Sequence, residues 1–363
     1  MARLPIRLVA AGFAALAVTC SGLGWAHANP SDVPNVSIAV RPSPVAAPAG
    51  TAAVGRVDTA VTDADRTVIV SAWYPTTETG RPAPYIPATG PATQLQIAAE
   101  SAAWLRTPGV ATMAGAQAAA TEVAPVAGDR LPVVLMSPGL ACPRFLLSGL
   151  ASDLASRGWV AVVMDHTGEA PAVELPDGRL AAGGPVMPDN SQYMRARLGD
   201  RMHDTRITLD RLPTLPIVGP HLDPTRIAMV GHSYGGLTAV QTTAIDPRVR
   251  AVVVLDGSAG WAGTAAPPTL DRPVLLLGSS ELPHPSWAQF HDSAFDYASV
   301  RDGGHYTATD LCALGGGPDK CGTLPADRAA IVTRDAVASW LDRHLLGHDL
   351  PRATHPELVW HTG

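Results

Sequence analysis

The sequence predicts an α/β protein in which helices cover both faces of a mostly parallel central sheet. The main observation is a series of short apolar runs that alternate with helical segments from Leu131 onward. Uninterrupted runs of this length are typical of strands that are buried on both faces. Alternation of such strands with helices favours a parallel sheet. The runs lie at residues 132–136, 159–164, 227–230, 251–255 and 274–277, and a final helix is expected at about 325–346.

The composition indicates one ordered domain. Of the 363 residues, 46% are hydrophobic, which is enough to build a sizeable core. Lys and Arg total 26 against 32 Asp and Glu, which gives a formal net charge of -6. This balance excludes a polybasic nucleic-acid binder and provides no attraction to anionic membranes. We find no internal repeat and no linker, so residues 51–363 are expected to form a single domain.

The N-terminus has the pattern of a secretory signal peptide. Arg3 and Arg7 precede an apolar run at residues 8–18, which is shorter than the roughly 20 residues needed to span a bilayer. A small-x-small cleavage site ends at Ala28. We therefore predict a signal peptide at residues 1–28, cleaved after Ala28, and a secreted mature chain. The alternative is a retained membrane anchor.

Three segments separate this signal from the first buried run. Residues 29–50 are rich in Pro and Ala, which predicts an extended or disordered lead-in. Residues 51–75 alternate apolar and polar side chains, which predicts antiparallel edge strands. Residues 92–120 are Ala-rich and helix-like. With Trp104, this helix would form either an apolar flap or interfacial helix near the substrate, or a plain core helix.

The segment Gly231-His232-Ser233-Tyr234-Gly235 is the one G-x-S-x-G motif of the chain. A buried-type strand runs directly into it, and a helical stretch follows at residues 237–245. In α/β-hydrolases such a strand–turn–helix elbow raises the Ser hydroxyl above the sheet. Small residues are needed on both sides because the backbones approach closely. The motif therefore predicts an α/β-hydrolase fold with Ser233 as nucleophile, in preference to Ser233 as an ordinary helix cap.

The base is expected after Ser233, because the chain order in these hydrolases is Ser, acid, His. His305 follows the strand-like residues 297–300 and lies beside glycines in a loop. A histidine in such a loop can reach back over the sheet. His305 is therefore the predicted base, with His284 and His291 as alternatives.

Two acidic residues are candidates for the third member. Asp256 ends the apolar run at 251–255, and Glu281 follows the next one. Both positions lie at the carboxyl edge of the predicted sheet. Spacing alone does not choose between them.

An oxyanion hole requires two backbone N–H donors. One is expected from the residue after the nucleophile, Tyr234. The other is expected from residues 137–141, the loop after an early central strand. Gly139 allows this loop to turn close to the substrate, so that the N–H of Leu140 or Ala141 points inward.

Cysteine usage agrees with an exported protein. Cys312 and Cys321 enclose a flexible polar loop, and we predict a disulfide between them, which oxidising conditions favour. Cys142 is expected to be a buried free thiol. The spacings do not match a zinc site, and neither H-E-x-x-H nor a phosphate-binding glycine motif occurs. We expect no metal and no cofactor.

These residues together resemble the plasma-type, group VII platelet-activating factor acetylhydrolases. Members of that family are calcium-independent α/β-hydrolases that cleave short acyl esters of phospholipids. The resemblance extends from Val54 to the end of the chain. It rests on Trp73-Tyr74-Pro75, Ser137-Pro138-Gly139-Leu140, residues 153–158, Asp165-His166, residues 231–236, Gln241-Thr242, Leu255-Asp256 and the last helix at 338–347.

The resemblance implies roles for individual residues. In that family the acid follows the strand after the nucleophile helix, which implies Asp256 in preference to Glu281. It also implies His305 as base and the amides of Leu140 and Tyr234 as oxyanion donors.

Two departures from the family concern the substrate. Ser137-Pro138 stands where the animal enzymes have a His beside the Gly, and residues 257–261 also differ. Trp261 and Trp104 are candidate pocket residues, and Trp261 would limit the length of the acyl chain. Bacterial polyester hydrolases and cutinase-like lipases share the same core and also have Ser-Pro-Gly loops.

We therefore expect a secreted serine esterase or lipase for short- to medium-chain carboxylic esters, with short-acyl phospholipids as one possible class. The alternatives are a cutinase-like polyester hydrolase, a broad carboxylesterase, or a non-catalytic binding protein with the hydrolase fold. The expected partners are a small-molecule, lipid or polyester substrate and a transient lipid interface, without nucleic acid or a protein partner. A phosphocholine-specific site is disfavoured, because a choline cage needs clustered aromatics and these are 5% of the chain.

Overall fold

The computed structural model describes residues 38–107, 109, 113–261, 263–267, 269–289 and 295–361. The predicted signal peptide, its cleavage site and His291 lie outside these residues. The described residues belong to one compact unit. No helix within them is both long enough and apolar enough to cross a membrane.

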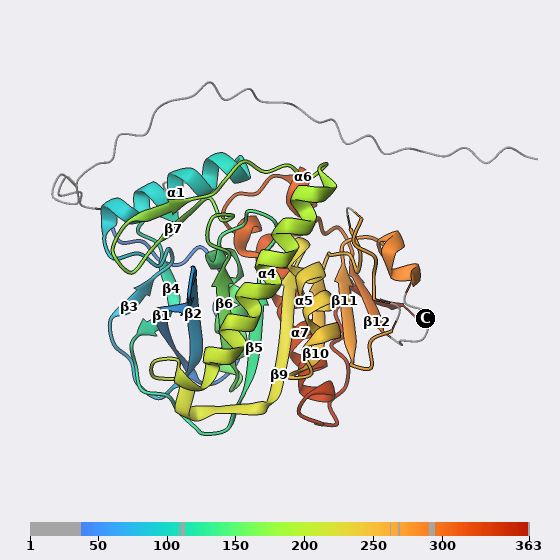
Figure 1. Ribbon diagram of the computed structural model, residues 1–363. Helices are drawn as coiled ribbons and strands as arrows, with labels where there is room; N and C mark the ends of the chain where they lie inside the picture. The colour runs from blue at the N-terminus through green and yellow to red at the C-terminus, as the bar shows by residue number, and fades with distance from the viewer. Residues whose placement is uncertain are drawn as a thin grey trace, which may run out of the picture. The chain divides into compact units, whose positions relative to one another are not determined.

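Within the described residues, an eleven-stranded mixed sheet forms the centre of the fold (Figure 1). Its middle strands are parallel, and each of the five predicted apolar runs falls on one of them. The predicted α/β class with a largely parallel centre is therefore confirmed. In spatial order these strands are β6 (Val160–Asp165), β5 (Leu131–Ser137), β9 (Leu222–His232), β10 (Val249–Leu255), β11 (Val274–Gly278) and β12 (Asp296–Val300).

Helices cover both faces of this sheet. In β5, Val133 and Leu135 face one way and Val134 and Met136 the other, because successive side chains of a strand alternate. The first pair packs in one core with α4 (Ser191–Arg211) and α5 (Tyr234–Ile245). The second pair packs with α3 (Ser148–Ser156) and α7 (Ala326–His344). Burial on both sides explains why these strands lack polar alternation. Figure 1 shows α4 crossing the near face.

The N-terminal strands differ from the prediction in their position. β1 (Ala53–Asp63) and β2 (Arg66–Thr76) form the predicted antiparallel pair. They are not edge strands, because β2 pairs with β6 and β1 pairs with β4 (Gln117–Glu122). β3 (Pro82–Pro84) lies beyond β4, and β13 (Leu358–His361) forms the opposite edge.

The helix expected at residues 92–120 is correct only in its first half. α1 (Pro91–Leu105) is a helix, whereas residues 117–120 belong to β4. Alanine favours helix, but pairing with β1 and β3 overrides this weak preference. Ile97 and Leu105 of α1 are buried in a core cluster, and Trp104 is 41% exposed. These contacts support the core-helix interpretation over a free flap.

The described part of the lead-in is held by the rest of the chain. The amide of Arg41 donates to the Gly115 carbonyl at 2.9 Å, and that of Ala49 donates to Asp153 Oδ1 at 2.8 Å. Arg334 of α7 donates to the Ala46 carbonyl at 2.9 Å. Apart from a single bridge at Arg41, residues 38–50 have no regular secondary structure, and these hydrogen bonds hold them against the rest of the chain.

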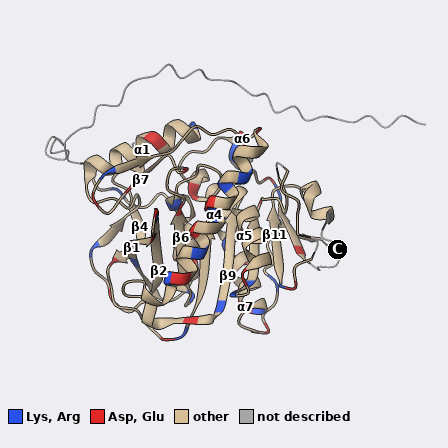
Figure 2. Ribbon diagram, viewed as in Figure 1, with Lys and Arg blue, Asp and Glu red and all other residues tan. Residues whose placement is uncertain are grey.

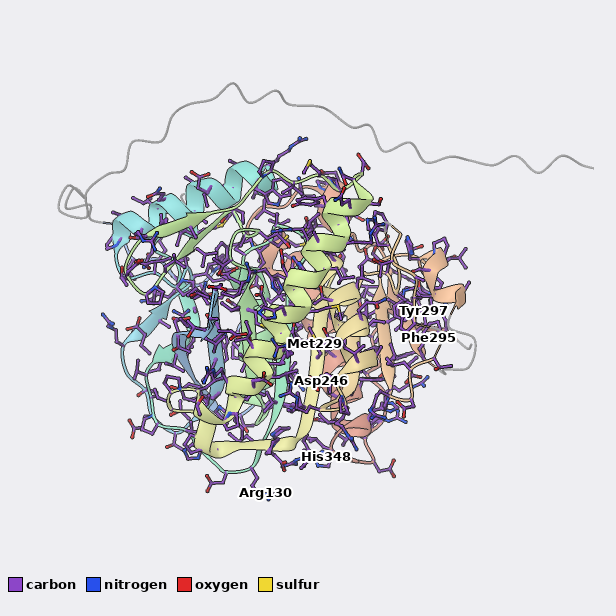
Figure 3. All side chains as sticks on the ribbon, in the orientation of Figure 1. Arg130, Met229, Asp246, Phe295, Tyr297 and His348 are labelled. Atoms are coloured by element: carbon purple, nitrogen blue, oxygen red, sulfur yellow. A yellow bond between two sulfur atoms is a disulfide. The ribbon has the colours of Figure 1, made fainter. Side chains whose placement is uncertain are left out.

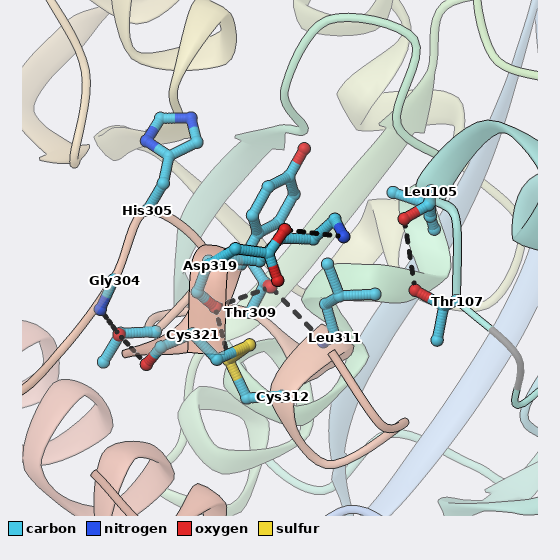
Figure 4. Close-up of a disulfide and its surroundings, with 12 residues drawn as sticks. Leu105, Thr107, Gly304, His305, Thr309, Leu311, Cys312, Asp319 and Cys321 are labelled. Atoms are coloured by element: carbon cyan, nitrogen blue, oxygen red, sulfur yellow. Dashed lines mark hydrogen bonds and ion pairs between the residues drawn. A yellow bond between two sulfur atoms is a disulfide. The ribbon is translucent and has the colours of Figure 1, made fainter. Parts of the chain in front are cut away.

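The structure contains the predicted disulfide between Cys312 and Cys321, with Cα atoms 5.5 Å apart (Figure 4). The bridge is connected to the loop that carries His305. The Thr307 hydroxyl contacts the Cys321 carbonyl at 3.3 Å and accepts the Gly304 amide at 2.6 Å. Cys142 is a buried free thiol, as predicted.

Removal of this bridge by Cys312→Ser and Cys321→Ser should lower the free energy of unfolding. A short loop of this kind contributes up to about 2–3 kcal/mol in the chain-entropy model. Urea unfolding of the double variant and the parent measures the difference. Mass spectrometry of non-reduced peptides is the check on the bridge itself, and two free thiols at these positions would contradict it.

Candidate active site

The carboxyl ends of three parallel strands carry the side chains of the candidate site. Ser233 follows β9, Asp256 follows β10, and His305 lies in the loop after β12. Arg130 precedes β5 and therefore marks the opposite end of the sheet, at the lower edge of Figure 3. Open parallel sheets generally bind ligands at the carboxyl ends of their strands.

Ser233 has φ 53° and ψ -116°, a conformation that non-glycine residues rarely adopt. The flanking glycines make this turn possible. A Cβ atom at Gly231 would lie 2.0 Å from the Gly235 carbonyl oxygen. One at Gly235 would lie 2.0 Å from the carbonyl oxygen of Ser137. The G-x-S-x-G pattern thus reflects close backbone approaches between β9, α5 and the loop after β5.

Gly235→Ala should destabilise the protein, because the new methyl group meets backbone that cannot move aside like a side chain. Overpacking typically costs about 1–3 kcal/mol, and we expect this variant to be at the upper end or not to fold. Gly199→Ala is a matched control on α4, since a Cβ there meets no atom within 4 Å. It should be neutral or slightly stabilising. Thermal unfolding of both variants makes the comparison, and equal midpoints would contradict the packing argument.

Ser233, His305 and Asp256 form a continuous hydrogen-bonded chain. His305 Nε2 lies 2.9 Å from Ser233 Oγ, and His305 Nδ1 lies 2.6 Å from Asp256 Oδ2. The other carboxylate oxygen, Asp256 Oδ1, accepts the Ser279 amide at 2.8 Å and the Ser279 hydroxyl at 3.0 Å. The side chain of His305 is 43% exposed, so a substrate can reach it.

The environment of Asp256 keeps its carboxyl group ionised. Burial alone would raise the pKa of Asp256, but hydrogen bonds and charge from His305, together with the Ser279 bonds, lower it below its ordinary value. An ionised carboxylate at this position can orient a histidine ring. Glu281, the alternative acid, is exposed after β11. His284, an alternative base, contacts Ser286 Oγ at 2.8 Å.

The loop after β5 lies against the first turn of α5, as the Gly235 contact shows. The Tyr234 amide is at the start of α5, where helix N–H groups have no intrahelical acceptor. The Ala141 amide donates to Glu169 Oε1 at 2.9 Å. Of the two amides that the loop pattern left open, Ala141 is therefore engaged elsewhere. Leu140, the donor that the family resemblance implies, remains the candidate.

His232, within the motif, was not predicted to have a role. It is buried, and its Nε2 lies 2.8 Å from the backbone oxygen of His305. Burial, and then the neighbouring charge of His305, lowers the pKa of His232 to about 3, so this ring is neutral at neutral pH. Its ring centroid lies 4.9 Å from that of His305. The His232 ring thus packs against His305 and contacts its backbone oxygen, and it does so from a position at which the motif allows any residue.

Trp261 lines a pocket of about 690 Å³ whose described lining includes none of Ser233, Asp256 and His305. It is 43% exposed, and its ring centroid lies 5.5 Å from that of His284. Trp104 is outside the lining of this pocket. The described lining residues come from three segments: the start of α4 and the residues before it, the loop after β10, and the loop and short 3-10 helix after β11. They are Pro188, Asp189, Ser191, Gly260, Trp261, Gly263, Thr264, Ala265, His284, Pro285 and Ser286.

The pocket is connected to the candidate site through the backbone after Asp256. The Trp287 indole donates to the Gly257 carbonyl at 3.0 Å, and the Ala259 amide donates to Ser286 Oγ at 3.0 Å. A Cβ at Gly257 would lie 2.6 Å from the Ser233 carbonyl oxygen. The loop that carries Trp261 therefore begins directly beside Ser233.

Residues 39–175 and 214–289 match the family described as platelet-activating factor acetylhydrolase, isoform II. These segments make up more than half of the chain. The chain belongs to this family. The resemblance predicted from the sequence is thereby confirmed. The matched segments include Ser233 and Asp256 but end before His305. The family match therefore does not test His305, and its place in the candidate site depends on the distances to Ser233 and Asp256.

Individual relatives match shorter parts of the chain. A probable 1-alkyl-2-acetylglycerophosphocholine esterase of Arthroderma benhamiae is 32% identical over 128 residues, which cover 35% of this chain and 31% of that protein. The platelet-activating factor acetylhydrolase of Bos taurus is 24% identical over 187 residues, or 44% of this chain and 42% of that protein. The chain's match thus spans less than half the length of these relatives.

Similarity to a solved structure covers nearly the whole chain. The ferulic acid esterase from Streptomyces cinnamoneus superposes with a TM-score of 0.72 and 33% sequence identity. The match covers 88% of this chain and 99% of that one. Together with the sheet order and the elbow at Ser233, it confirms the predicted α/β-hydrolase fold.

Proposed function

We propose that this chain is a secreted serine esterase that hydrolyses short- to medium-chain carboxylic esters through Ser233, His305 and Asp256. The observation that carries this proposal is the hydrogen-bonded chain of these three side chains, with Ser233 on a strained turn. Family membership and the likeness to a solved esterase support ester chemistry.

The proposed reaction is a two-step acyl transfer. His305 takes the proton of Ser233 Oγ as this oxygen attacks the ester carbonyl. The Leu140 and Tyr234 amides donate to the oxyanion of the tetrahedral intermediate. His305 then protonates the leaving alkoxide, which leaves an acyl group on Ser233. Water attacks this acyl-enzyme with His305 again as base, and the acid product and free Ser233 result.

Asp256 acts on His305 in both steps. Its carboxylate faces Nδ1, so the proton of the neutral ring is held there and Nε2 is free to accept the Ser233 proton. The negative charge also stabilises the imidazolium form that each step generates. Replacement of Asp256 or of His305 should therefore slow both acylation and deacylation.

Trp261 is proposed to limit the length of the acyl chain. With p-nitrophenyl esters from C2 to C16, kcat/KM should be greatest for short or medium chains and fall for longer ones. Trp261→Ala should shift this optimum to longer chains. Trp104→Ala removes an equally exposed indole outside the pocket, and the profile should not change. A wild-type kcat/KM that rises steadily to C16 would contradict a short pocket.

Aromatic acyl esters are a second candidate class. The solved neighbour is a ferulic acid esterase, and the pocket here presents the rings of Trp261 and His284 beside Pro188 and Pro285. Methyl ferulate, a short-acyl phospholipid and a polyester film belong in the same assay panel. The substrate with the highest kcat/KM identifies the class, and no turnover of any ester would favour the non-catalytic alternative.

Secretion is proposed from the N-terminal signal and is supported by the disulfide. N-terminal sequencing of the protein from the culture medium should begin at Asn29. A protein that stays in the membrane fraction with Met1 intact would support the retained anchor instead.

A further inference from the structure

We propose that Arg201 and Glu169 are positioning residues that orient the Leu140 amide toward the reacting carbonyl. Neither side chain is part of the proposed triad, and the sequence did not indicate either one. The inference rests on the proposed function, because an oriented donor matters only if an oxyanion forms at Ser233.

Arg201 projects from α4 into the loop after β5. Its guanidinium group donates to the carbonyl oxygens of Pro138 and Gly139, both at 2.8 Å, and lies 3.3 Å from Ser137 Oγ. Its Nε also donates to both carboxylate oxygens of Glu169, at 2.9 and 3.1 Å. The planar guanidinium, with five donors in a rigid fork, suits several acceptors at once. The last residue of β5 and the first two residues of the loop thus share one cation.

The bond to Gly139 fixes the direction of the Leu140 amide. The carbonyl of Gly139 and the N–H of Leu140 belong to one planar trans peptide, so they point in opposite directions. Because the Gly139 oxygen points toward the guanidinium group of Arg201, the Leu140 N–H must point away from that group. The Cys142 amide donates to the same carbonyl at 3.0 Å, so rotation of this peptide would break two hydrogen bonds, one from Arg201 and one from Cys142.

Glu169 holds the other side of Leu140. Its Oε1 accepts the Ala141 amide at 2.9 Å. Ala141 has φ 52°, a left-handed conformation that is unfavourable for alanine. Such a conformation persists where the surroundings determine it. Leu140 is therefore held between two fixed peptides, by Arg201 before it and by Glu169 after it.

The same guanidinium contacts the residue that supplies the second donor. Its carbon atom lies 5.1 Å from the centroid of the Tyr234 ring, a cation–π distance. The Tyr234 hydroxyl in turn donates to the Met194 carbonyl of α4. One side chain thus connects the loop of Leu140 to the start of α5.

Both charges of the pair are buried and balanced. The side chains of Arg201 and Glu169 are 1% and 3% exposed. Burial alone would lower the pKa of Arg201 and raise that of Glu169, but each partner's charge and hydrogen bonds reverse the shift. Figure 2 shows charges of both signs along α4. A buried ion pair often contributes little to the net stability of a protein. Because this pair lies directly against the loop of Leu140, we assign it a role in positioning that loop.

A second chain of side chains, His166, Asp204 and Arg66, holds Ser137 at the end of β5. The Ser137 hydroxyl lies 2.9 Å from His166 Nε2, and His166 Nδ1 lies 2.9 Å from Asp204 Oδ2. Arg66 of β2 binds both oxygens of Asp204, at 2.6 and 2.7 Å. The loop is thus anchored to β2 and α4, which limits how far it can relax if Arg201 is changed.

The test uses Arg201→Lys and Glu169→Gln with p-nitrophenyl butyrate and its thionoester, in which sulfur replaces the carbonyl oxygen. Sulfur is larger and accepts hydrogen bonds weakly, so an intact oxyanion hole favours the oxygen ester. An oxyanion donor is worth on the order of 10²–10³ in rate. For a misaligned donor we expect kcat to fall about 10–100-fold with little change in KM, and the ester-to-thionoester ratio of kcat/KM to fall as well.

The ester-to-thionoester ratio of kcat/KM distinguishes a misaligned oxyanion donor from a loss of stability. A smaller folded fraction lowers the rates with both substrates equally, so it leaves the ratio unchanged. Arg56→Lys is the matched control, since the Arg56 side chain is also 1% exposed and bonds Asp58 and the Pro84 carbonyl on β1 and β3. It should lower stability and leave the ratio unchanged. If Arg201→Lys gives no folded protein, Glu169→Gln, which retains the guanidinium-to-carbonyl bonds, supplies the measurement.

A wild-type ratio in the folded variants would overturn the inference, whatever their stability. Failure of the proposed function gives a different result. If the proposed function is wrong, Ser233→Ala will hydrolyse the ester as fast as the wild-type protein does. If turnover depends on Ser233 but the ester-to-thionoester ratio of kcat/KM is unchanged in the variants, only the role of Arg201 and Glu169 is refuted.

Discussion

Ser233→Ala is expected to lower kcat by on the order of 10⁴-fold or more, with the fold retained. Alanine lacks the oxygen that attacks the ester, so no acyl-enzyme can form. Residual turnover would come from substrate binding and the oxyanion donors alone. Hydrolysis of p-nitrophenyl butyrate measures kcat, and circular dichroism checks the fold.

Ser339→Ala is a suitable control for this variant. Ser339 lies on α7, and its hydroxyl donates to the Ala336 carbonyl of the same helix at 3.4 Å. Its kcat should equal that of the parent. Wild-type turnover in Ser233→Ala would show that another group performs the chemistry.

Asp256→Asn is expected to lower kcat by about 10³–10⁴-fold. Asparagine has nearly the same size, but its amide group favours the wrong tautomer of His305 and provides no charge for the imidazolium. Because the pKa of Asp256 is lowered in the folded protein, the parent carboxylate is ionised at the neutral pH of the assay. The expected fall in kcat therefore reflects the removal of the negative charge of the Asp256 carboxylate.

Glu281→Gln is the matched control, since both acids follow neighbouring strands of the sheet. Glu281 is exposed, whereas Asp256 lies 2.6 Å from His305. The Glu281 variant should lose far less activity. The reverse ranking of the two variants would refute the assignment of Asp256 as acid.

The parts of the site that were predicted from the sequence depend on local or topological rules. The elbow at Ser233 is local, because the strained turn requires glycines at fixed offsets. Asp256 was predicted because the carboxyl ends of parallel strands meet at one edge. His305 was predicted because it follows Ser233 and the acid in the chain and lies beside glycines in a loop. The choice of Asp256 over Glu281 needed the family resemblance, since both positions end a strand.

The remaining features depend on contacts between distant residues. The loop pattern alone could not separate Leu140 from Ala141, and the choice of Leu140 needed the family resemblance. The contacts that distinguish the two amides come from Arg201 and Glu169, which lie far along the chain. Residues 117–120 are Ala-rich and became a strand only through pairing with β1 and β3. A single sequence contains no signal for such long-range partners, because an isolated Arg or Glu resembles any surface charge.

Labelling with a p-nitrophenyl alkylphosphonate, followed by peptide mass spectrometry, tests the central claim most directly. The phosphonate reacts with an activated serine and releases p-nitrophenol, and the bond it forms survives digestion. We predict one label per molecule, on Ser233, and no label in Ser233→Ala. A label on a different serine, or equal labelling of the Ser233→Ala variant, would contradict the account.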